Sequence, residues 1–330
     1  MERNFIQENA AQAGPAIHDQ ASIWKRFKKQ RTLQVFVLLG IVYLLIFSYT
    51  PMFGILMAFK QYTIVTGIRG IFTSPWAGLQ NFREFFTDYR FGQIVRNTLA
   101  LSILKVVFTF PLPILFAIML NELRNMVFKR FVQTVSYLPH FISWVVVVGL
   151  SYSFFSSEVG IVNRLLMGIG IIGKPLTILT DPNSFWGFAV GSAAWKEMGW
   201  WAIIFLAAIA GINPSLYEAA QIDGAGRLAR IRHITLPGIK GTVVVVLILT
   251  VGSILGGGLV GSNFEQSLLL GNDINNPTSE IVQTYAFKVG LSQGRFSFAA
   301  AIDLIQSIIS VTLVFLSNSI AKRVSGSSLF

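Results

Sequence analysis

The chain has 330 residues, of which 53% are hydrophobic and 12% charged, and its formal net charge is +11. Soluble domains usually carry about 25% charged residues, so this composition predicts a membrane protein, with the basic residues meeting anionic lipid rather than nucleic acid. The absence of cysteine excludes disulfides, and three histidines scattered through the chain disfavour a metal centre.

Residues 1–31 are polar, lack apolar periodicity and end in the basic run Trp24–Arg31. We expect a cytoplasmic N-terminal tail, with an amphipathic segment lying on anionic lipid as the alternative. A signal peptide is disfavoured because the charged region and the apolar run after it are both too long. Residues 32–330 are then expected to form one transmembrane domain.

Six segments are long and apolar enough to cross a bilayer, which takes about 20 residues of helix. They are Leu33–Phe59, Asn97–Leu120, Val132–Phe155, Phe185–Ile212, Thr242–Val260 and Ala299–Ile320. Several contain proline or glycine, which predicts kinks around a path, although ordinary packing kinks explain them as well. The predicted fold class is therefore an all-α integral membrane protein with six transmembrane helices.

Lys and Arg are concentrated in the tail, the second-to-third link, the fourth-to-fifth link and the C-terminal end. Because cytoplasmic connections carry the excess of basic residues, this side is predicted to be cytoplasmic. Both termini and the fourth-to-fifth link are then inside, and the protein is a multi-pass protein of a cytoplasmic membrane.

The fourth-to-fifth link, residues 213–240, is a polar interruption between apolar segments. Ser215-x-x-Glu218 fits a capping box at the start of a short helix from Leu216 to Ile222. Asp223-Gly224 predicts a turn, Asp223 could cap a second short helix ending near Arg232, and Pro237 could break the chain before the fifth span. Small residues would let another protein approach this helix-turn-helix closely, but an ordinary linker explains the same pattern.

This link resembles the EAA motif of ABC-importer permeases, in its Glu218-Ala219-Ala220, Gly224 and Ile234-Thr-Leu236-Pro237. The resemblance implies that the loop 213–240 is a coupling helix that docks into a cleft of a cytoplasmic ATPase. The coupling residues it implies are Glu218, Ala219, Ala220, Asp223, Gly224, Leu236 and Pro237. Ile231 departs from the pattern, since many maltose-type permeases have an aromatic residue there.

Further stretches look like one branch of the carbohydrate permeases, which includes rhamnogalacturonan and alginate importers. They include Ser48–Gly54, Ser74–Phe82, Ser136–Trp144 and Trp195–Glu197, and the likeness runs from about Arg31 to the end. It implies a type I ABC importer fold in the inner membrane of a bacterium. The implied partners are a second homologous permease forming a heterodimer, two ATPase subunits holding ATP and Mg, and an extracytoplasmic solute-binding protein that delivers oligosaccharide.

The fourth span contains Trp195-Lys196-Glu197-Met-Gly-Trp200-Trp201. Charges within a span usually face the bundle interior or a water-filled path, and tryptophans stack on sugar rings, so these residues and Trp144 are a candidate substrate path. An interfacial aromatic belt is the alternative, but Trp195 lies roughly 15 Å along the helix from Phe185, near mid-membrane. Neighbours on a helix do not share a face, so Lys196 and Glu197 are expected to have separate partners.

The other polar residues of the spans have simpler interpretations. Lys105 and Asp303 are expected to snorkel or form local ion pairs, and His140 to be a satisfied buried histidine. Gly252, Gly256, Gly257 and Gly261 predict close helix packing near a permease–permease interface, with Asn263–Gln266 lining an outer vestibule.

Some functions are disfavoured by absent motifs. The chain has no phosphate-binding loop of the G-x-x-x-x-G-K-[ST] type and no serine elbow, so we expect neither ATP hydrolysis, nor other catalysis, nor a cofactor in this chain. An ion-coupled secondary transporter or channel is the main alternative, but Glu197 and Asp303 form no evident proton relay. A membrane scaffold without transport is the third hypothesis.

Overall fold

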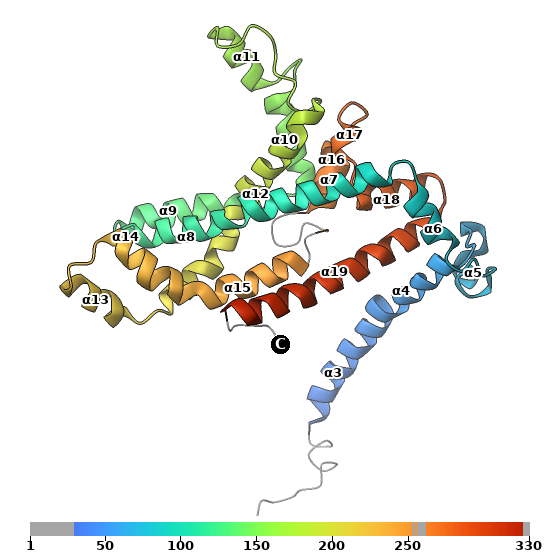
Figure 1. Ribbon diagram of the computed structural model, residues 1–330, viewed down its shortest axis with the longest axis horizontal. Coiled ribbons are helices and arrows are strands. Elements are labelled where there is room, and N and C mark those ends of the chain that lie inside the picture. Colours follow the sequence, from blue (N-terminus) through green and yellow to red (C-terminus); the bar gives the residue numbers. More distant parts are fainter. Residues whose placement is uncertain (1–29, 253–254, 256–261, 326–330) are drawn as a thin grey trace, which may run out of the picture. The chain divides into compact units, whose positions relative to one another are not determined.

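The structure is a computed structural model that describes residues 30–252, 255 and 262–325. In these residues the chain forms helices joined by loops (Figure 1). It divides into two compact units, Met1–Gly54 and Ile55–Phe330. The predicted tail 1–31 lies almost entirely outside the described residues.

In the first unit, the described residues form α3 (Arg31–Leu44), the π-helix η1 (Leu45–Tyr49) and α4 (Thr50–Met52). No residue of these three elements is buried. A helix that is apolar on all sides and buries nothing within its own chain is suited to lipid or to a neighbouring protein.

The remaining elements lie in the second unit, apart from the start of η2. They are η2 (Phe53–Phe59), η3 (Ile64–Thr66), α5 (Gly67–Thr73), α6 (Gln80–Thr87), α7 (Phe91–Leu104), η4 (Lys105–Thr109), α8 (Pro111–Glu122), α9 (Met126–Tyr137), η5 (Leu138–Phe141), α10 (Trp144–Phe155), α11 (Ile161–Gly168), α12 (Pro182–Ala210), α13 (Pro214–Ile222), α14 (Arg227–Arg230), η6 (Ile231–Thr235), α15 (Leu236–Gly252), α16 (Asn263–Leu270), α17 (Asn276–Ser279), α18 (Val282–Ser292) and α19 (Phe296–Ser325).

The six predicted spans are confirmed, five as helices long and apolar enough to cross a membrane and one as a bent pair. The five are Arg31–Phe59, Phe91–Glu122, Pro182–Ala210, Arg227–Gly252 and Phe296–Arg323. The fifth begins well before the predicted Thr242, because α14, η6 and α15 are continuous. The predicted break at Pro237 is wrong. Pro237 is the second residue of α15, directly after the π-helix η6, and the helix runs through it without a break.

The third span is broken, which hydropathy alone did not indicate. The axis of the helix bends by 102° between Met126–Phe141 and Trp144–Phe155. Pro139 lies in the 3₁₀ turn η5 just before the break, and Ser143 caps α10 by accepting a hydrogen bond from the Val146 N–H. The predicted proline kink is therefore present, but it is a sharp corner rather than a gentle bend.

Helix α12 is at the centre of the second unit, packed against α8, α9 and α15, while α19 packs against α15 and α18 (Figure 1). The C-terminal half of α12, which includes Phe205, packs in one core cluster with Ala117 and Ile239. The N-terminal half of α12 packs in another with Leu101 and Ile281. Gly252 of α15 packs against Val314 of α19, within this chain. The other three glycines of that predicted cluster lie outside the described residues.

Candidate functional site

The coupling loop, residues 213–240, begins with α13, whose cap differs from the prediction. The Asn213 side chain accepts a hydrogen bond from the Ser215 N–H, and Pro214 occupies the first helical position. The Ser215–Glu218 capping box is therefore wrong, because Asn213 already caps the helix two residues earlier. The Glu218 side chain is left exposed and makes no hydrogen bond or ion pair within the described part of the chain.

The turn after α13 requires Gly224, which has a φ of +78°. The Ala225 N–H donates to the Ala220 carbonyl at 2.8 Å, and the Gly224 N–H donates to the Gln221 carbonyl at 3.1 Å. Asp223 ends α13 and does not cap the second helix, whose cap position is taken by Gly226. That prediction is wrong because three further residues, Gly224 to Gly226, separate Asp223 from the start of α14.

The coupling loop presents an exposed apolar surface. No residue of α13 is buried, and Ile222 and Leu228 are 87% and 78% exposed. Ala219 and Leu236 are also exposed, and Ala220 is half-buried. Exposed apolar side chains grouped on one loop are typical of a protein-binding surface.

Two contacts attach this loop to the spans. The Tyr217 hydroxyl is 3.0 Å from the Thr235 hydroxyl, which is buried at the start of the fifth span. Arg227 Nε lies 3.9 Å from Glu122 Oε2 at the end of α8. A cleft of about 510 Å³ between α8, α12 and α13 is lined by Glu122, Arg227 and Glu218. Helix α13 is therefore linked to the fifth span through Tyr217, while α14 is linked to the second span through Arg227.

A second site, the intramembrane cluster, consists of Lys105, His140, Lys196 and Glu197. Lys196 Nζ donates to the His140 carbonyl at 2.7 Å and lies 3.3 Å from Glu197 Oε1. The other oxygen of Glu197 is 2.8 Å from His140 Nδ1. The prediction that Lys196 and Glu197 have separate partners is thus only half right. They also pair with each other, because both side chains converge on His140 at the corner of the third span.

Lys196 stabilises the chain at this corner by donating to a backbone carbonyl. The His140 carbonyl belongs to the last turn before the break, where carbonyls lose their helical partners and a cation is favourable. Lys196 Nζ also lies 5.6 Å from the centre of the Trp144 ring. The ammonium is thus engaged by a carbonyl, a carboxylate and an aromatic face.

The neighbouring residues of this motif also pack against the broken span. The Trp200 ring is parallel to the His140 ring, with centroids 4.5 Å apart. Gly199 faces the backbone of α9, where an added Cβ would lie 2.0 Å from the Ser136 carbonyl oxygen. The stretch 196–200 therefore docks the corner of the third span onto α12.

We predict that Gly199→Ala lowers the stability of the protein by about 1–3 kcal/mol, because the methyl group meets backbone that cannot move aside easily. The matched control is Gly191→Ala on the same helix, where an added Cβ meets nothing within 4 Å. Thermal unfolding in detergent measures both. Equal melting temperatures for the two variants would refute the close approach at Gly199.

A cavity of about 430 Å³ adjoins the cluster. Its lining includes His140, Trp144, Lys196, Glu197, Trp201 and Glu265. The indole N–H of Trp201 is buried and has no hydrogen-bond partner among the described residues. Four of the predicted path residues thus line one cavity: Trp144, Lys196, Glu197 and Trp201. Trp200 does not line it and stacks on the ring of His140. Trp195 is 49% exposed and lines a separate apolar groove beside α10.

Other predictions about charged and polar residues need correction. Of the two outcomes expected for Lys105, snorkelling is wrong, because the residue is fully buried in the π-helix η4. Asp303 is exposed on α19. Asn263 and Gln266, expected in a vestibule, are fully buried, with Gln266 Nε2 donating to the Ala189 carbonyl at 2.9 Å. His140 was missed as a site residue, and its position next to Pro139 was the available signal.

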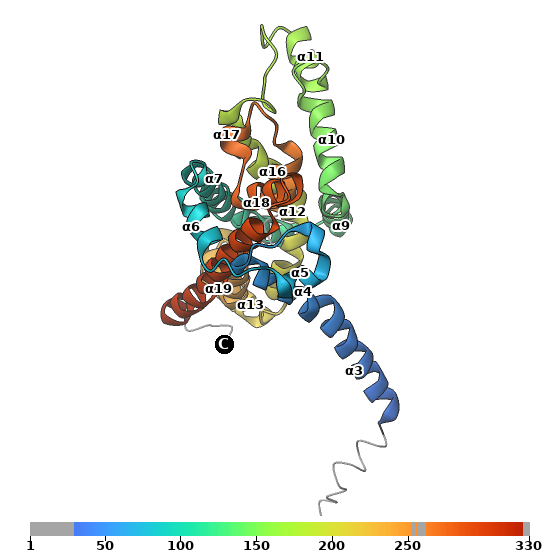
Figure 2. The ribbon, with the colours of Figure 1, turned by 90° about the vertical axis from the view of Figure 1, so that its right-hand side faces the viewer.

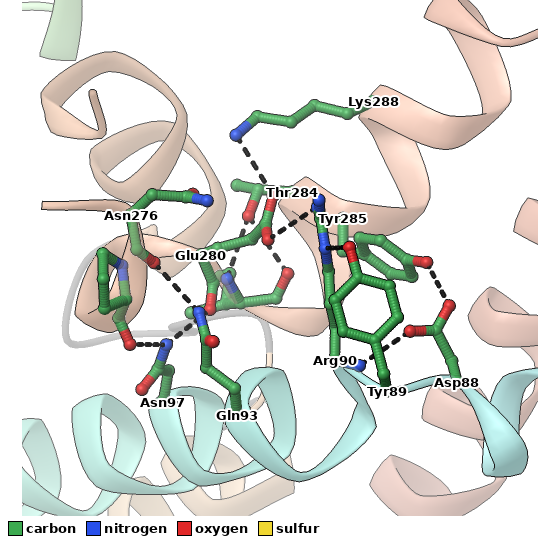
Figure 3. Close-up of polar contacts among 12 residues, drawn as sticks. Asp88, Tyr89, Arg90, Gln93, Asn97, Asn276, Glu280, Thr284, Tyr285 and Lys288 are labelled. Carbon is green, nitrogen blue, oxygen red and sulfur yellow. Dashed lines mark hydrogen bonds and ion pairs between the residues drawn. The ribbon is translucent and has the colours of Figure 1, made fainter. Parts of the chain in front are cut away.

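A third group, the α7–α18 cluster, ties together segments far apart in the sequence (Figure 3). Glu280 is nearly inaccessible and pairs with Arg90 at 3.4 Å and Lys288 at 3.3 Å. Asn97 Nδ2 donates to the Glu280 carbonyl at 2.9 Å. Tyr285 donates to Asp88, and burial together with this bond raises the pKa of Tyr285, which keeps the hydroxyl protonated.

We expect Glu280→Gln to destabilise the protein by about 1–3 kcal/mol, because two cations lose the buried carboxylate that they share. Glu84→Gln is the matched control, since the pair between Glu84 and Arg295 is exposed on both sides and should contribute at most about 1 kcal/mol. Denaturation monitored by intrinsic fluorescence compares them. The cluster has no stabilising role if the two variants unfold alike.

Among the described residues, no group of three or more His, Cys, Asp or Glu side chains could hold a metal ion. The arrangement instead consists of a loop with an exposed apolar surface at one set of helix ends, a cavity at a broken span, and contacts that connect the two through α8 and α12.

Residues 109–326 match the family model described as "Binding-protein-dependent transport system inner membrane component". Protein LplB of Bacillus subtilis (strain 168) is 41% identical over 303 residues, covering 92% of each chain. The polygalacturonan/rhamnogalacturonan transport system permease protein YteP of the same organism is 42% identical over 295 residues, covering 89% of each chain.

Two solved structures are similar over nearly the whole chain. One is a crystal structure of a bacterial ABC transporter involved in the import of the acidic polysaccharide alginate, with a TM-score of 0.82 and 38% identity over 92% of this chain and 99% of that one. The other is the bacterial alginate ABC transporter in complex with an alginate pentasaccharide-bound periplasmic protein, with a TM-score of 0.82 and 37% identity over 93% and 99%.

Proposed function

Since this chain belongs to the family of binding-protein-dependent transport system inner membrane components, we propose that it is the permease subunit of an ATP-driven importer of acidic, pectin- or alginate-derived oligosaccharides. That it is a permease of an oligosaccharide ABC importer follows from the family and from relatives that cover nearly the whole chain. The acidic substrate class rests on the polygalacturonan/rhamnogalacturonan permease and the alginate importer to which the chain is similar.

The coupling loop is the observation that carries the proposal. It holds the EAA-type residues at an exposed helix and turn, and it is attached to the second and fifth spans. The proposed partner there is a cytoplasmic ATPase subunit that holds ATP and Mg. A second, homologous permease would complete the transport path, and an extracytoplasmic binding protein would deliver the sugar. In this arrangement the coupling loop and both termini are cytoplasmic.

The cavity beside the intramembrane cluster is the proposed sugar path within this subunit. Trp144 and Trp201 line this cavity, and their rings can stack on the apolar faces of sugar rings. Lys196 is already engaged by the His140 carbonyl and Glu197, so it has little capacity to bind a uronate carboxylate. Recognition of the substrate's charge is then assigned to the binding protein and the second permease.

The proposal is tested by uptake of labelled oligogalacturonate or oligoalginate in cells that carry the complete importer. Uptake should stop when ATP is depleted and persist when an uncoupler dissipates the proton gradient. The opposite pattern would favour an ion-coupled secondary transporter. If uptake is unchanged when the gene for this chain is deleted, the chain is no part of the transport system.

A further inference from the structure

The connection between the third and fourth spans is a folded hairpin, residues 156–181, that contains α11. Asn163 is buried and holds it closed: Nδ2 donates to the Ser156 and Leu176 carbonyls at 3.0 Å each, and Oδ1 accepts from the Leu176 N–H at 2.8 Å. At Gly160 an added Cβ would lie 2.3 Å from the Ser156 carbonyl oxygen. The hairpin is therefore a built element with a defined conformation.

This hairpin exposes apolar side chains that its own chain does not cover. Leu165 on α11 and Ile169, the residue directly after this helix, are 62% and 67% exposed, and Val159 and Ile171 are 62% and 67% exposed. Figures 1 and 2 show α11 beyond the end of α10, where other helices of the unit do not pack on it. The exposed basic residues Arg164 and Lys174 accompany this apolar surface.

The bend in the third span determines how far this hairpin lies from the bilayer centre. Met126–Phe141 and Trp144–Phe155 are about 24 Å and 18 Å long at helical rise. Because the helix axis bends by 102° away from straight, they cover about 27 Å from end to end, which is less than the roughly 30 Å of hydrocarbon in a bilayer. With Met126 at the opposite edge of the hydrocarbon, Phe155 therefore lies no farther out than the near edge, and α11 follows within six residues.

We infer that the α11 hairpin is a lipid-binding surface, lying in the interfacial layer with Leu165 and Ile169 toward acyl chains and Arg164 and Lys174 toward lipid phosphates. The exposed apolar face of α10, with Val145 at 65% and Phe154 at 42%, continues into the hairpin, as expected for one continuous lipid contact. The inference requires only that the spans lie in a membrane. It does not depend on the substrate or on coupling.

The absence of cysteine in the chain allows a direct test with single-cysteine variants. Leu165→Cys and Ile169→Cys carry a nitroxide label in the complete importer, reconstituted in nanodiscs of phosphatidylglycerol and phosphatidylethanolamine. The reference is Glu158→Cys, an exposed polar position of the same hairpin. Collision rates with oxygen, which partitions into lipid, and with a water-soluble nickel complex are measured by electron paramagnetic resonance.

The ratio of oxygen to nickel collisions should be at least about threefold higher at positions 165 and 169 than at position 158. Equal ratios at all three positions would place the hairpin in water and overturn the inference. Protection of 165 and 169 from both oxygen and nickel would also overturn it, because the surface would then be covered by another subunit. Uptake measured on the same variants separates this test from that of the proposed function.

Discussion

Replacing Gly224 with valine is expected to uncouple the importer while leaving the spans inserted. Gly224 has a φ of +78°, which a β-branched residue adopts only with strain of about 1–3 kcal/mol. The strain would displace the turn that orients Glu218 and Ala219. A penalty of this size corresponds to a loss of about 5- to 150-fold in affinity for the ATPase subunit. Copurification of the ATPase and uptake in proteoliposomes measure the loss.

Gly226→Ala is the matched control for this substitution. It lies in the same turn, has an ordinary φ of −67°, and an added Cβ would meet nothing within 4 Å. We expect it to retain ATPase binding and most of the uptake. If Gly224→Val and Gly226→Ala bind the ATPase equally well, the conformation of this turn is not what the partner recognises.

Replacing Glu197 with alanine is expected to cost about 3–5 kcal/mol of stability, because it removes the carboxylate that pairs with buried Lys196 and attracts buried Lys105. It also removes the carboxylate oxygen that lies 2.8 Å from His140 Nδ1 at the corner of the third span. The melting temperature of the purified complex and its yield should both fall sharply. Glu265→Ala, at an exposed carboxylate on the same cavity, should change stability by less than about 0.5 kcal/mol.

A double-mutant cycle shows whether the pair acts as a unit. In Lys196→Met with Glu197→Gln, both charges of the pair are gone, so the double variant should be more stable than the sum of the single losses predicts. Additive losses would mean that Lys196 and Glu197 are independent. The interpretation of this stretch as a docking motif for the broken span would then fail.

The spans were predictable from sequence because a helix must be apolar over about 20 residues to cross a bilayer, and hydropathy records that directly. The break in the third span was not, because Val132–Phe155 is apolar on both sides of Pro139 and forms one continuous window. A proline indicates a kink, but its angle depends on what packs into the corner. Here Lys196 and Gly199, more than fifty residues away, make that corner possible.

The coupling loop shows where local patterns are ambiguous. Asn213-Pro214 and Ser215-x-x-Glu218 are both patterns that favour a helix start, and their two possible cap residues lie only two positions apart. The structure uses Asn213, since Pro214 fits the first helical position. The family motif identified the loop, but only the observed cap shows that Glu218 is exposed rather than part of a capping box. The convergence of Lys196, Glu197 and His140 is a tertiary effect that neighbour rules for a single helix cannot predict.

The central claim is that ATP binding and hydrolysis by a partner act on this permease through α13. It is tested most directly by uptake of labelled oligosaccharide into proteoliposomes that contain the complete complex, with wild-type chain or with Glu218→Ala. Uptake by the wild type should require both ATP and the binding protein, and the variant should lose uptake together with ATPase docking. Uptake without ATP, or full ATP-driven uptake by Glu218→Ala, would contradict the claim.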